Sequence, residues 1–136
     1  MDVPEALDFV RSNHHGIMAT TRADGHVAMS PIACTVDGRG RVVVSTRETA
    51  MKVKHLQRDP HVAICVITAG FFGEWVQVEG NAEIVHLPEA MDGLIDYYRN
   101  ISGEHPDWDD YRAAMERERR VLLRITVTRA GPNRQG

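Results

Sequence analysis

The clearest pattern along the chain is an alternation of apolar and polar residues between positions 74 and 86. Apolar or small residues occupy every second position from Val76 to Ile84, which predicts a half-buried strand. Trp75 falls on the polar face of that strand, where a large aromatic side chain often marks an interface or a ligand surface. Shorter apolar runs rich in β-branched residues predict further strands at 16–21, 26–37, 41–45, 62–67 and 121–128. The run at 62–67 is apolar throughout, so we expect it to be buried on both faces.

Helical periodicity and turn residues complete the outline. Helices are predicted at 4–13, shortly after 45, at 88–101 and at 108–118. Asp-Gly pairs at 24–25 and 37–38 indicate tight turns, so the sheet is expected to be antiparallel. Six strands with short connections favour a mainly β fold, a small Greek-key barrel with helices outside, in one domain over 1–136. An open α+β sheet is the alternative, and the polar tail 130–136 is expected to fray.

One stretch combines strand, turn and helix start in a way that is typical of anion sites. The hydroxyls of Ser45, Thr46 and Thr49 follow a buried strand, and a short helical pattern then runs until Pro60 ends it. Free backbone N–H groups at such a helix start converge on an anion together with neighbouring hydroxyls.

Lys52 strengthens this interpretation. If Thr49 is the N-cap, Lys52 lies in the first turn, where a cation is unfavourable unless an anion is bound. Plain capping is the alternative, because Ser45 and Glu48 fit a capping box and Glu48 and Lys52 are spaced for an ion pair. The stretch alone leaves both open.

Charge along the chain favours the first interpretation. The 136 residues are 43% hydrophobic and 26% charged, as in an ordinary globular domain, and a net charge of −3 makes nucleic acid a poor partner. Residues 39–58 hold six Lys and Arg against one acid, which gives +5, and residues 88–118 hold nine acids against three Arg, which gives −6. Because the basic segment overlaps the candidate site, it favours a small polyanionic ligand.

The sequence shows no motif or segment typical of several other functional classes. No apolar run approaches a membrane span, and the acidic N-terminus is unlike a signal peptide, so a cytoplasmic protein without a membrane partner is expected. Cys34 and Cys65 stand alone in apolar runs, which predicts two reduced core thiols. No metal-binding, P-loop, dinucleotide-binding or nucleophile-elbow motif is present, so no metal site is expected and redox or transfer chemistry would belong to a bound cofactor.

Four blocks of the sequence resemble a known family. They are Gly16–Thr20 with Asp24–Gly25, Ser45–Lys52 with Leu56–Pro60, Val76–Gly80, and Tyr98–Arg112. The chain resembles the pyridoxamine 5'-phosphate oxidase-like split β-barrel family, and within it the actinobacterial oxidoreductases that use coenzyme F420. The Tyr98–Arg112 block is the most specific and is similar to this deazaflavin branch.

The resemblance implies a homodimer with two cofactors at the subunit interface, acting on a small molecule. It implies that the phosphate and ribityl chain of the cofactor are bound by Ser45, Thr46, Thr49, Ala50, Met51 and Lys52. The cofactor ring would lie beside Met29, Ser30, Pro31 and Ile32, and Trp75 of the partner subunit would contact it. Pro31 suits this, because proline inside a strand indicates an edge or a bulge. Many members carry arginine at the position of Ala50, so phosphate binding here is expected to depend on Lys52, hydroxyls and backbone N–H groups, with help from Arg47.

The expected activity is hydride transfer between coenzyme F420 and an unsaturated or quinone-like molecule, with no catalytic acid or base assigned. F420 carries an oligoglutamate tail, and Lys54 and Arg58 share a helix face that could meet it. The alternatives are an FMN-binding flavoprotein and a non-catalytic carrier of a cofactor or of haem.

Overall fold

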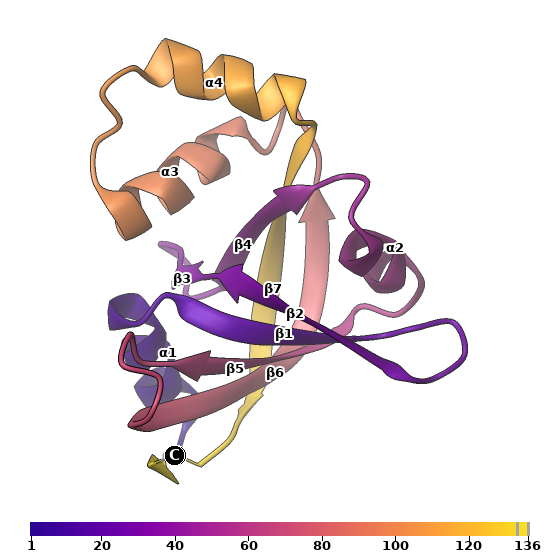
Figure 1. The fold of residues 1–136 in the computed structure, drawn as a ribbon, viewed down its shortest axis with the longest axis vertical. Helices are drawn as coiled ribbons and strands as arrows, with labels where there is room; N and C mark the ends of the chain where they lie inside the picture. Colours follow the sequence, from indigo (N-terminus) through magenta and orange to yellow (C-terminus); the bar gives the residue numbers. More distant parts are fainter. Residues whose placement is uncertain (133, 136) are drawn as a thin grey trace.

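The computed structural model describes residues 1–132 and 134–135. Its helices are α1 (Val3–Ser12), α2 (Met51–Arg58), α3 (Met91–Ser102) and α4 (Trp108–Arg117). Its strands are β1 (His15–Thr21), β2 (Val27–Ala33), β3 (Thr35–Val36), β4 (Val42–Arg47), β5 (His61–Ile67), β6 (Glu74–Val85), β7 (Arg120–Ala130) and β8 (Arg134–Gln135), arranged as in Figure 1.

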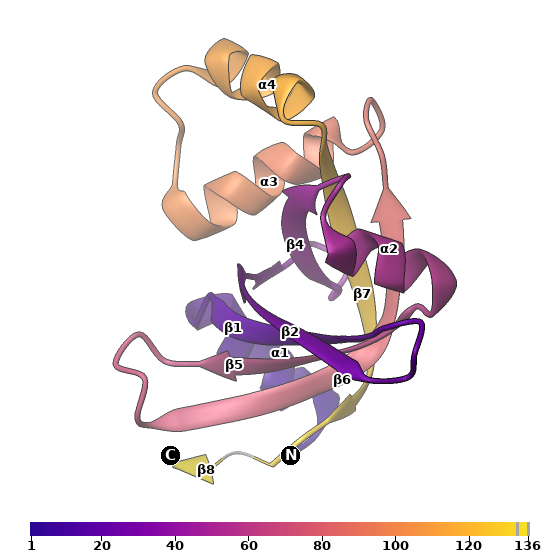
Figure 2. The same cartoon turned by 45° about the vertical axis from the view of Figure 1, so that its right-hand side comes forward.

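The strands form one antiparallel sheet that curls into a split barrel. Their order is β2-β1-β5-β6-β7-β4-β3, and β8 pairs with β6 beyond this path. No ladder in the described part of the chain joins β2 to β4, so the barrel is open along that seam (Figures 1 and 2). The predicted antiparallel barrel with peripheral helices is therefore confirmed.

The predicted count of six strands is wrong, because the expected strand 26–37 is divided. The backbone N–H of Cys34 still donates to the carbonyl of His14, at 2.8 Å, in the register of the β1–β2 ladder. The next two residues then pair with β4 as β3, on the far side of the seam from β2. The main path of the sheet thus has seven strands. The short strand β8 lies in the tail 130–136 that was expected to fray, and residues 133 and 136 of this tail lie outside the described residues.

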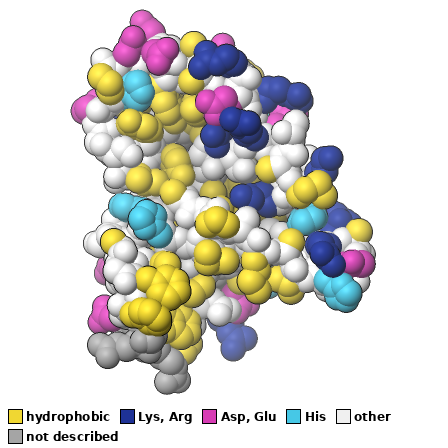
Figure 3. All heavy atoms as spheres, viewed as in Figure 1, with side chains coloured by type: hydrophobic (Ala, Val, Ile, Leu, Met, Phe, Trp, Pro, Cys, Tyr) yellow, Lys and Arg dark blue, Asp and Glu magenta, His cyan; other side chains and the backbone are white. Residues whose placement is uncertain are grey.

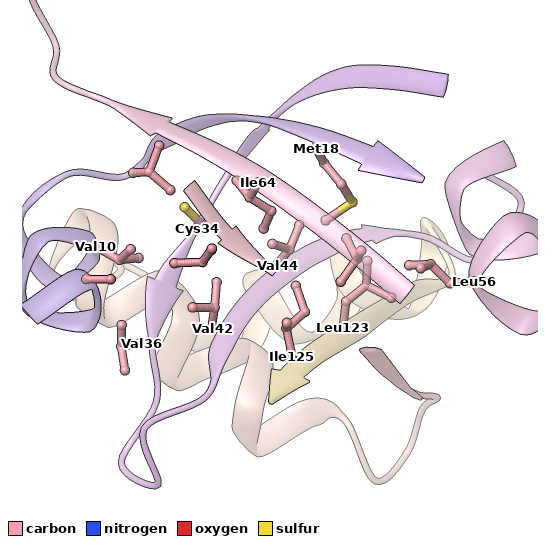
Figure 4. Close-up of a cluster of buried hydrophobic side chains, with 14 of the residues drawn as sticks. Val10, Met18, Cys34, Val36, Val42, Val44, Leu56, Ile64, Leu123 and Ile125 are labelled. Carbon is pink, nitrogen blue, oxygen red and sulfur yellow. The ribbon is translucent and has the colours of Figure 1, made fainter. Parts of the chain in front are cut away.

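Alternating side chains of the strands fill the barrel. Val44, Ile64 and Leu123 are completely buried, and Figure 4 shows them pointing into a shared core. Val10 of α1 enters at one end and Leu56 of α2 at the other, so these helices close the two ends of the barrel.

A second, smaller core joins α3 and α4 to the outside of the barrel. Leu94 and Tyr111 pack against Val43 and Leu122, which are the outward residues of β4 and β7. The Tyr111 hydroxyl donates to the carbonyl of Leu94 at 2.8 Å and ties the two helices together. Figure 2 shows this pair above β4.

A β-bulge bends the long strand β6 at Gly80. The register of β6 against β7 shifts between Glu79 and Gly80, and a Cβ at Gly80 would lie 1.9 Å from the carbonyl oxygen of Thr126. Only glycine permits this approach of two backbones. The bulge therefore explains why glycine interrupts an otherwise apolar alternation.

The expectation that 62–67 is buried on both faces is wrong. Val62, Ile64 and Val66 are buried in the barrel, whereas Ala63, Cys65 and Ile67 are half-buried on its outer face. Cys34 is a core thiol as predicted, but Cys65 is not. The reason is that no helix or strand of the described residues covers the outer face of β5 and its neighbours.

Candidate functional site

A cavity of about 260 Å³ lies between β2 and the start of α2. Met29 and Ser30 come from the stretch expected beside a cofactor ring, and Met51 and Lys52 come from the stretch expected around a phosphate. The fold thus brings together two segments that are separated by twenty residues in sequence. The remaining lining residues are Thr20, Ala28 and His55.

The start of α2 has no side-chain cap. Ala50 is the N-cap, with extended backbone angles of φ −63° and ψ 143°, and its methyl group accepts no hydrogen bond. The supposition that Thr49 is the N-cap is therefore wrong, although Lys52 still lies in the first turn. The capping-box alternative is also wrong, because Ser45 lies within β4 and Glu48 accepts a hydrogen bond from Arg119 at 3.1 Å.

Two backbone N–H groups at this helix start have no hydrogen-bond acceptor among the described residues. The N–H of Val53 donates to the carbonyl of Ala50 at 3.0 Å. Those of Met51 and Lys52 have no acceptor within residues 1–132 and 134–135. Uncapped N–H groups and the positive end of a helix dipole favour an anion.

Positive charge gathers around the same helix start. Arg47 and Arg120 share the carboxylate of Glu118, at 3.7 and 2.8 Å, while Lys52 has no ion pair in the described part of the chain. Three cations and one acid leave a local excess of two positive charges. Burial, and secondly the charge of Arg120, lower the pKa of Lys52. A bound anion would relieve this repulsion.

His55 and Thr20 also line the cavity, although neither stands out in the sequence. His55 is only 6% exposed and Thr20 only 4%. The hydroxyl of Thr20 lies 3.0 Å from Nδ1 of His55, which links α2 to β1. The position of His55, three residues after Lys52 and so on an adjacent part of the helix surface, is the signal that would have found it.

The other predicted residues of β2 and β4 do not line the cavity. Pro31 is exposed on β2, which is an edge strand as its proline predicts, and Ile32 packs against the barrel core. Thr46 is 7% exposed and pairs with Val121 in the sheet. Ser45 is half-buried on the neighbouring face of β4.

Tyr97 of α3 bridges the seam beside Ser45. Its hydroxyl donates to the carbonyl of Ala33 at the end of β2, at 2.9 Å. Burial raises the pKa of Tyr97, and the backbone N–H of Ser45 partly opposes this effect. The tyrosine therefore connects the two strands that the barrel leaves unpaired, a role that its place in a helical stripe did not reveal.

Trp75 lies away from this cavity within one chain. It pairs with Ile67 across the β5–β6 ladder and lines a second, apolar hollow of about 210 Å³ with Cys65, Phe71 and Phe72. A tryptophan contact to a cofactor in the first cavity would have to come from another copy of the chain, as the resemblance implies.

An antiparallel split β-barrel with an open seam and peripheral helices defines the fold class of the protein. The family model described as pyridoxamine 5'-phosphate oxidase matches residues 3–133, and the chain belongs to this family.

Solved structures share the fold over almost the whole chain. The conserved hypothetical protein Rv2991 from Mycobacterium tuberculosis is 28% identical with a TM-score of 0.77, over 96% of this chain and 82% of that one. A protein described as an F420 reductase is 20% identical with a TM-score of 0.69, over 91% of this chain and 94% of that one. General stress protein 26 from Bacillus anthracis is 15% identical with a TM-score of 0.64, over the full length of both.

The described residues contain neither a candidate membrane-spanning helix nor a candidate metal-binding cluster. Their helices include none with the length and apolar composition needed to cross a membrane. No three His, Cys, Asp or Glu side chains among them are grouped to hold a metal ion.

Proposed function

We propose that the protein is a coenzyme F420-dependent oxidoreductase. It would transfer a hydride between the deazaflavin and an unsaturated or quinone-like small molecule. The observation that carries the proposal is the cavity between β2 and α2. There the uncapped start of α2 and Lys52, which has no ion pair within the described residues, face an edge strand of the barrel. The likeness to an F420 reductase supports the fold alone, so the proposal depends on the site and on the sequence resemblance.

The residues present fit an anionic cofactor. Lys52 and the N–H groups of Met51 and Lys52 would hold its phosphate, since each is a donor without a partner in the described residues. Met29 and Ser30 would flank the adjoining part of the cofactor from β2, followed along the strand by Pro31 and Ile32.

Charge beyond the cavity favours the deazaflavin over FMN. Lys54 is exposed on α2 and has no ion pair in the described chain, so it is available to an oligoglutamate tail. Arg58 is one turn further on, where its guanidinium donates to the carbonyl of Thr21 and is held at the end of β1. FMN is the second candidate, because Lys52 and the helix start suit the phosphate of either cofactor equally well.

When bound, the deazaflavin supplies the hydride. The chain's own contribution is orientation and the exclusion of water. The phosphate contacts at α2 fix one end of the cofactor, and the apolar side chains of β2 shield the part that follows. No side chain of this chain is assigned as a proton donor.

The active form would be a homodimer in which the second copy of the chain covers the outer face of β1, β2 and β5. On this face Val27, Met29 and Ile17 are 57%, 71% and 38% exposed, and Phe71 and Phe72 at the adjacent hairpin are 63% and 75% exposed. Figure 3 shows hydrophobic side chains gathered over these strands in the lower half of the molecule. Contiguous apolar surface of this kind indicates an interface. A second copy would also supply the partner's tryptophan to the cavity.

Titration with oxidised coenzyme F420 and with FMN tests the proposal. We expect one F420 bound per chain, followed by reduction of a quinone-like or enone acceptor when reduced F420 is supplied. Tight binding of FMN alone would make the protein a flavoprotein. Binding of reduced F420 without turnover on any acceptor panel would favour the carrier function.

A further inference from the structure

The hairpin that joins β5 to β6 carries two phenylalanines that lie in solvent. Phe71 and Phe72 are both largely exposed, and their rings meet edge to face with centroids 4.9 Å apart. Phe71 has a φ of 69°, in the left-handed region that is strained for a bulky side chain. Such strain persists only where the surrounding structure maintains it, and it is frequent at functional sites. An exposed aromatic pair on a strained backbone therefore indicates a surface that contacts another molecule.

The hairpin and the cavity lie at diagonally opposite corners of the outer face of β2, β1, β5 and β6. At the cavity corner, Met29 pairs with Ala19 of β1 and also lines the cavity. At the hairpin corner, Trp75 pairs with Ile67, whose partner on β1 is His15. Three strand spacings and four residues of β1 separate the two corners, which corresponds to about 19 Å. Figures 1 and 2 show the hairpin and α2 at opposite ends of these strands.

The two corners have complementary shapes. Met29 protrudes from β2 and is the most exposed residue of that strand's apolar side chains. The apolar hollow of about 210 Å³ lies at the hairpin corner, between Trp75 and the two phenylalanines. A thioether suits such a hollow, because sulfur makes favourable contacts with the edges of aromatic rings. Met29 of one copy of the chain therefore fits the hollow of a second copy.

The charges of the two corners are complementary as well. The cavity corner carries Lys52 and the uncapped start of α2. In the stretch 62–78, which includes the hairpin, Glu74 is the only charged residue of the sequence. If like corners of two copies met, two positive helix starts would face each other. If opposite corners meet, each helix start faces a hairpin whose single charge is negative.

Twofold symmetry leaves two arrangements in which the corners of two copies meet. A twofold contact uses the same residues on both copies, and its axis would cross the face at the central Ile17–Cys65 pair. One diagonal axis sets each corner against the same corner of the partner. The other diagonal axis exchanges the corners, so that each hairpin lies over the partner's Met29. The complementary shapes and charges favour the exchange.

We propose that the Phe71–Phe72 hairpin of one copy docks against Met29 of the other and forms an aromatic wall of that copy's cavity. The site is then incomplete within one chain, and the wall selects the substrate. Aromatic rings stack on flat conjugated molecules, and a hairpin without Lys or Arg offers no ion pair to an anionic one. The substrate class is thus a neutral, planar acceptor such as a naphthoquinone. The assignment to a substrate rests on the proposed function, whereas the contact between the copies does not.

Cysteine cross-linking tests the contact without any cofactor. Met29→Cys and Phe72→Cys are combined in a Cys65→Ala background, since the remaining thiol of Cys34 is buried. A short bismaleimide cannot join opposite corners of one chain, so a covalent dimer on a denaturing gel reports contact between copies. We expect the double variant to cross-link and each single variant not to do so. Cross-linking of Phe72→Cys alone, or none in the double variant, would overturn the proposal.

Steady-state kinetics test the wall. We expect Phe72→Ala to raise KM about threefold to tenfold for menadione and less than about twofold for cyclohexenone, because only the larger flat ring stacks on the wall. Val27→Ala is the matched control, since Val27 is exposed on the same face and lines neither the cavity nor the hollow. Equal changes of KM for both acceptors, or no larger change than in the control, would contradict selection by the wall.

The outcomes distinguish this inference from the proposed function. Cross-linking of the double variant, with no binding of F420 or FMN to the unaltered protein, would support the contact and overturn the redox proposal. Turnover with F420 by a protein whose double variant does not cross-link would overturn the inference and leave the redox proposal intact. A monomer by light scattering that binds neither cofactor would overturn both.

Discussion

Replacing Lys52 with methionine separates the binding role of this residue from any role in stability. Methionine keeps most of the apolar length of the side chain and removes its charge. In the folded protein, burial and the charge of Arg120 lower the pKa of Lys52, so the folded state binds its proton less tightly than the unfolded state does. The charge therefore opposes folding at neutral pH. We expect Lys52→Met without ligand to be at least as stable as the original.

Binding should respond in the opposite direction. A lysine about 4 Å from a single negative charge gains about 1 kcal/mol in water and about 4 kcal/mol near a protein surface of low effective dielectric. Lys52 is half-buried, so we take about 2 kcal/mol, which corresponds to a roughly 30-fold loss of affinity. A bound ligand should accordingly raise the melting temperature of the original protein more than that of the variant.

The assay is calorimetric titration with FMN and F420, combined with thermal unfolding in the presence and absence of each. Lys54→Met is the matched control, because Lys54 lies two residues further on the same helix and does not line the cavity. Lys54→Met should leave the affinity for FMN unchanged. It should lower the affinity for F420 only about threefold, because the contact of Lys54 with the oligoglutamate tail is lost. Equal loss of FMN affinity in both variants, or destabilisation of Lys52→Met without ligand, would refute the reasoning.

Three other predictions concern the fold and the interface. Gly80→Ala should lower the free energy of unfolding in urea by about 3 kcal/mol or more, because the added Cβ would lie 1.9 Å from a backbone oxygen. A decrease of less than about 1 kcal/mol would argue against the bulge. Burial raises the pKa of Cys34 to about 12 from 9.0, so the free energy of unfolding should fall between these pH values by at most about 1.4 kcal/mol per pH unit. This dependence of stability on pH should be weaker in Cys34→Ala, and an unchanged dependence would be inconsistent with a buried thiol. Ile17→Asp, on the outer face of β1, should convert a dimer into a monomer by light scattering without loss of secondary structure; an unchanged mass would place the interface elsewhere.

The barrel could be predicted from the sequence because local patterns determine most of its strands. Alternation identified β6, and Asp-Gly pairs identified two of the turns. The division of the second strand could not be predicted, because it depends on the pairing of Thr35 and Val36 with β4, which the apolar run itself does not show. The uncovered face of β5 was also missed, since an apolar run looks the same whether its outer side meets a helix or a second chain.

The site could be predicted only in part. The hydroxyl-rich turn and Lys52 were visible in sequence, and the fold places Lys52 at a cavity with Met29 and Ser30. The helix start was misplaced by one residue, because Thr49 is a better cap by type than Ala50 and only the backbone shows which residue leaves the helix. His55 was missed because Thr20, the residue that orients it, lies 35 positions away.

A crystal structure of the protein with bound coenzyme F420 tests the central claim most directly. The account predicts phosphate oxygens within about 3 Å of the Lys52 ammonium nitrogen at the start of α2, with the ring along β2 and the tail passing Lys54. A coenzyme bound on another face, with the space between β2 and α2 filled only by water, would contradict it.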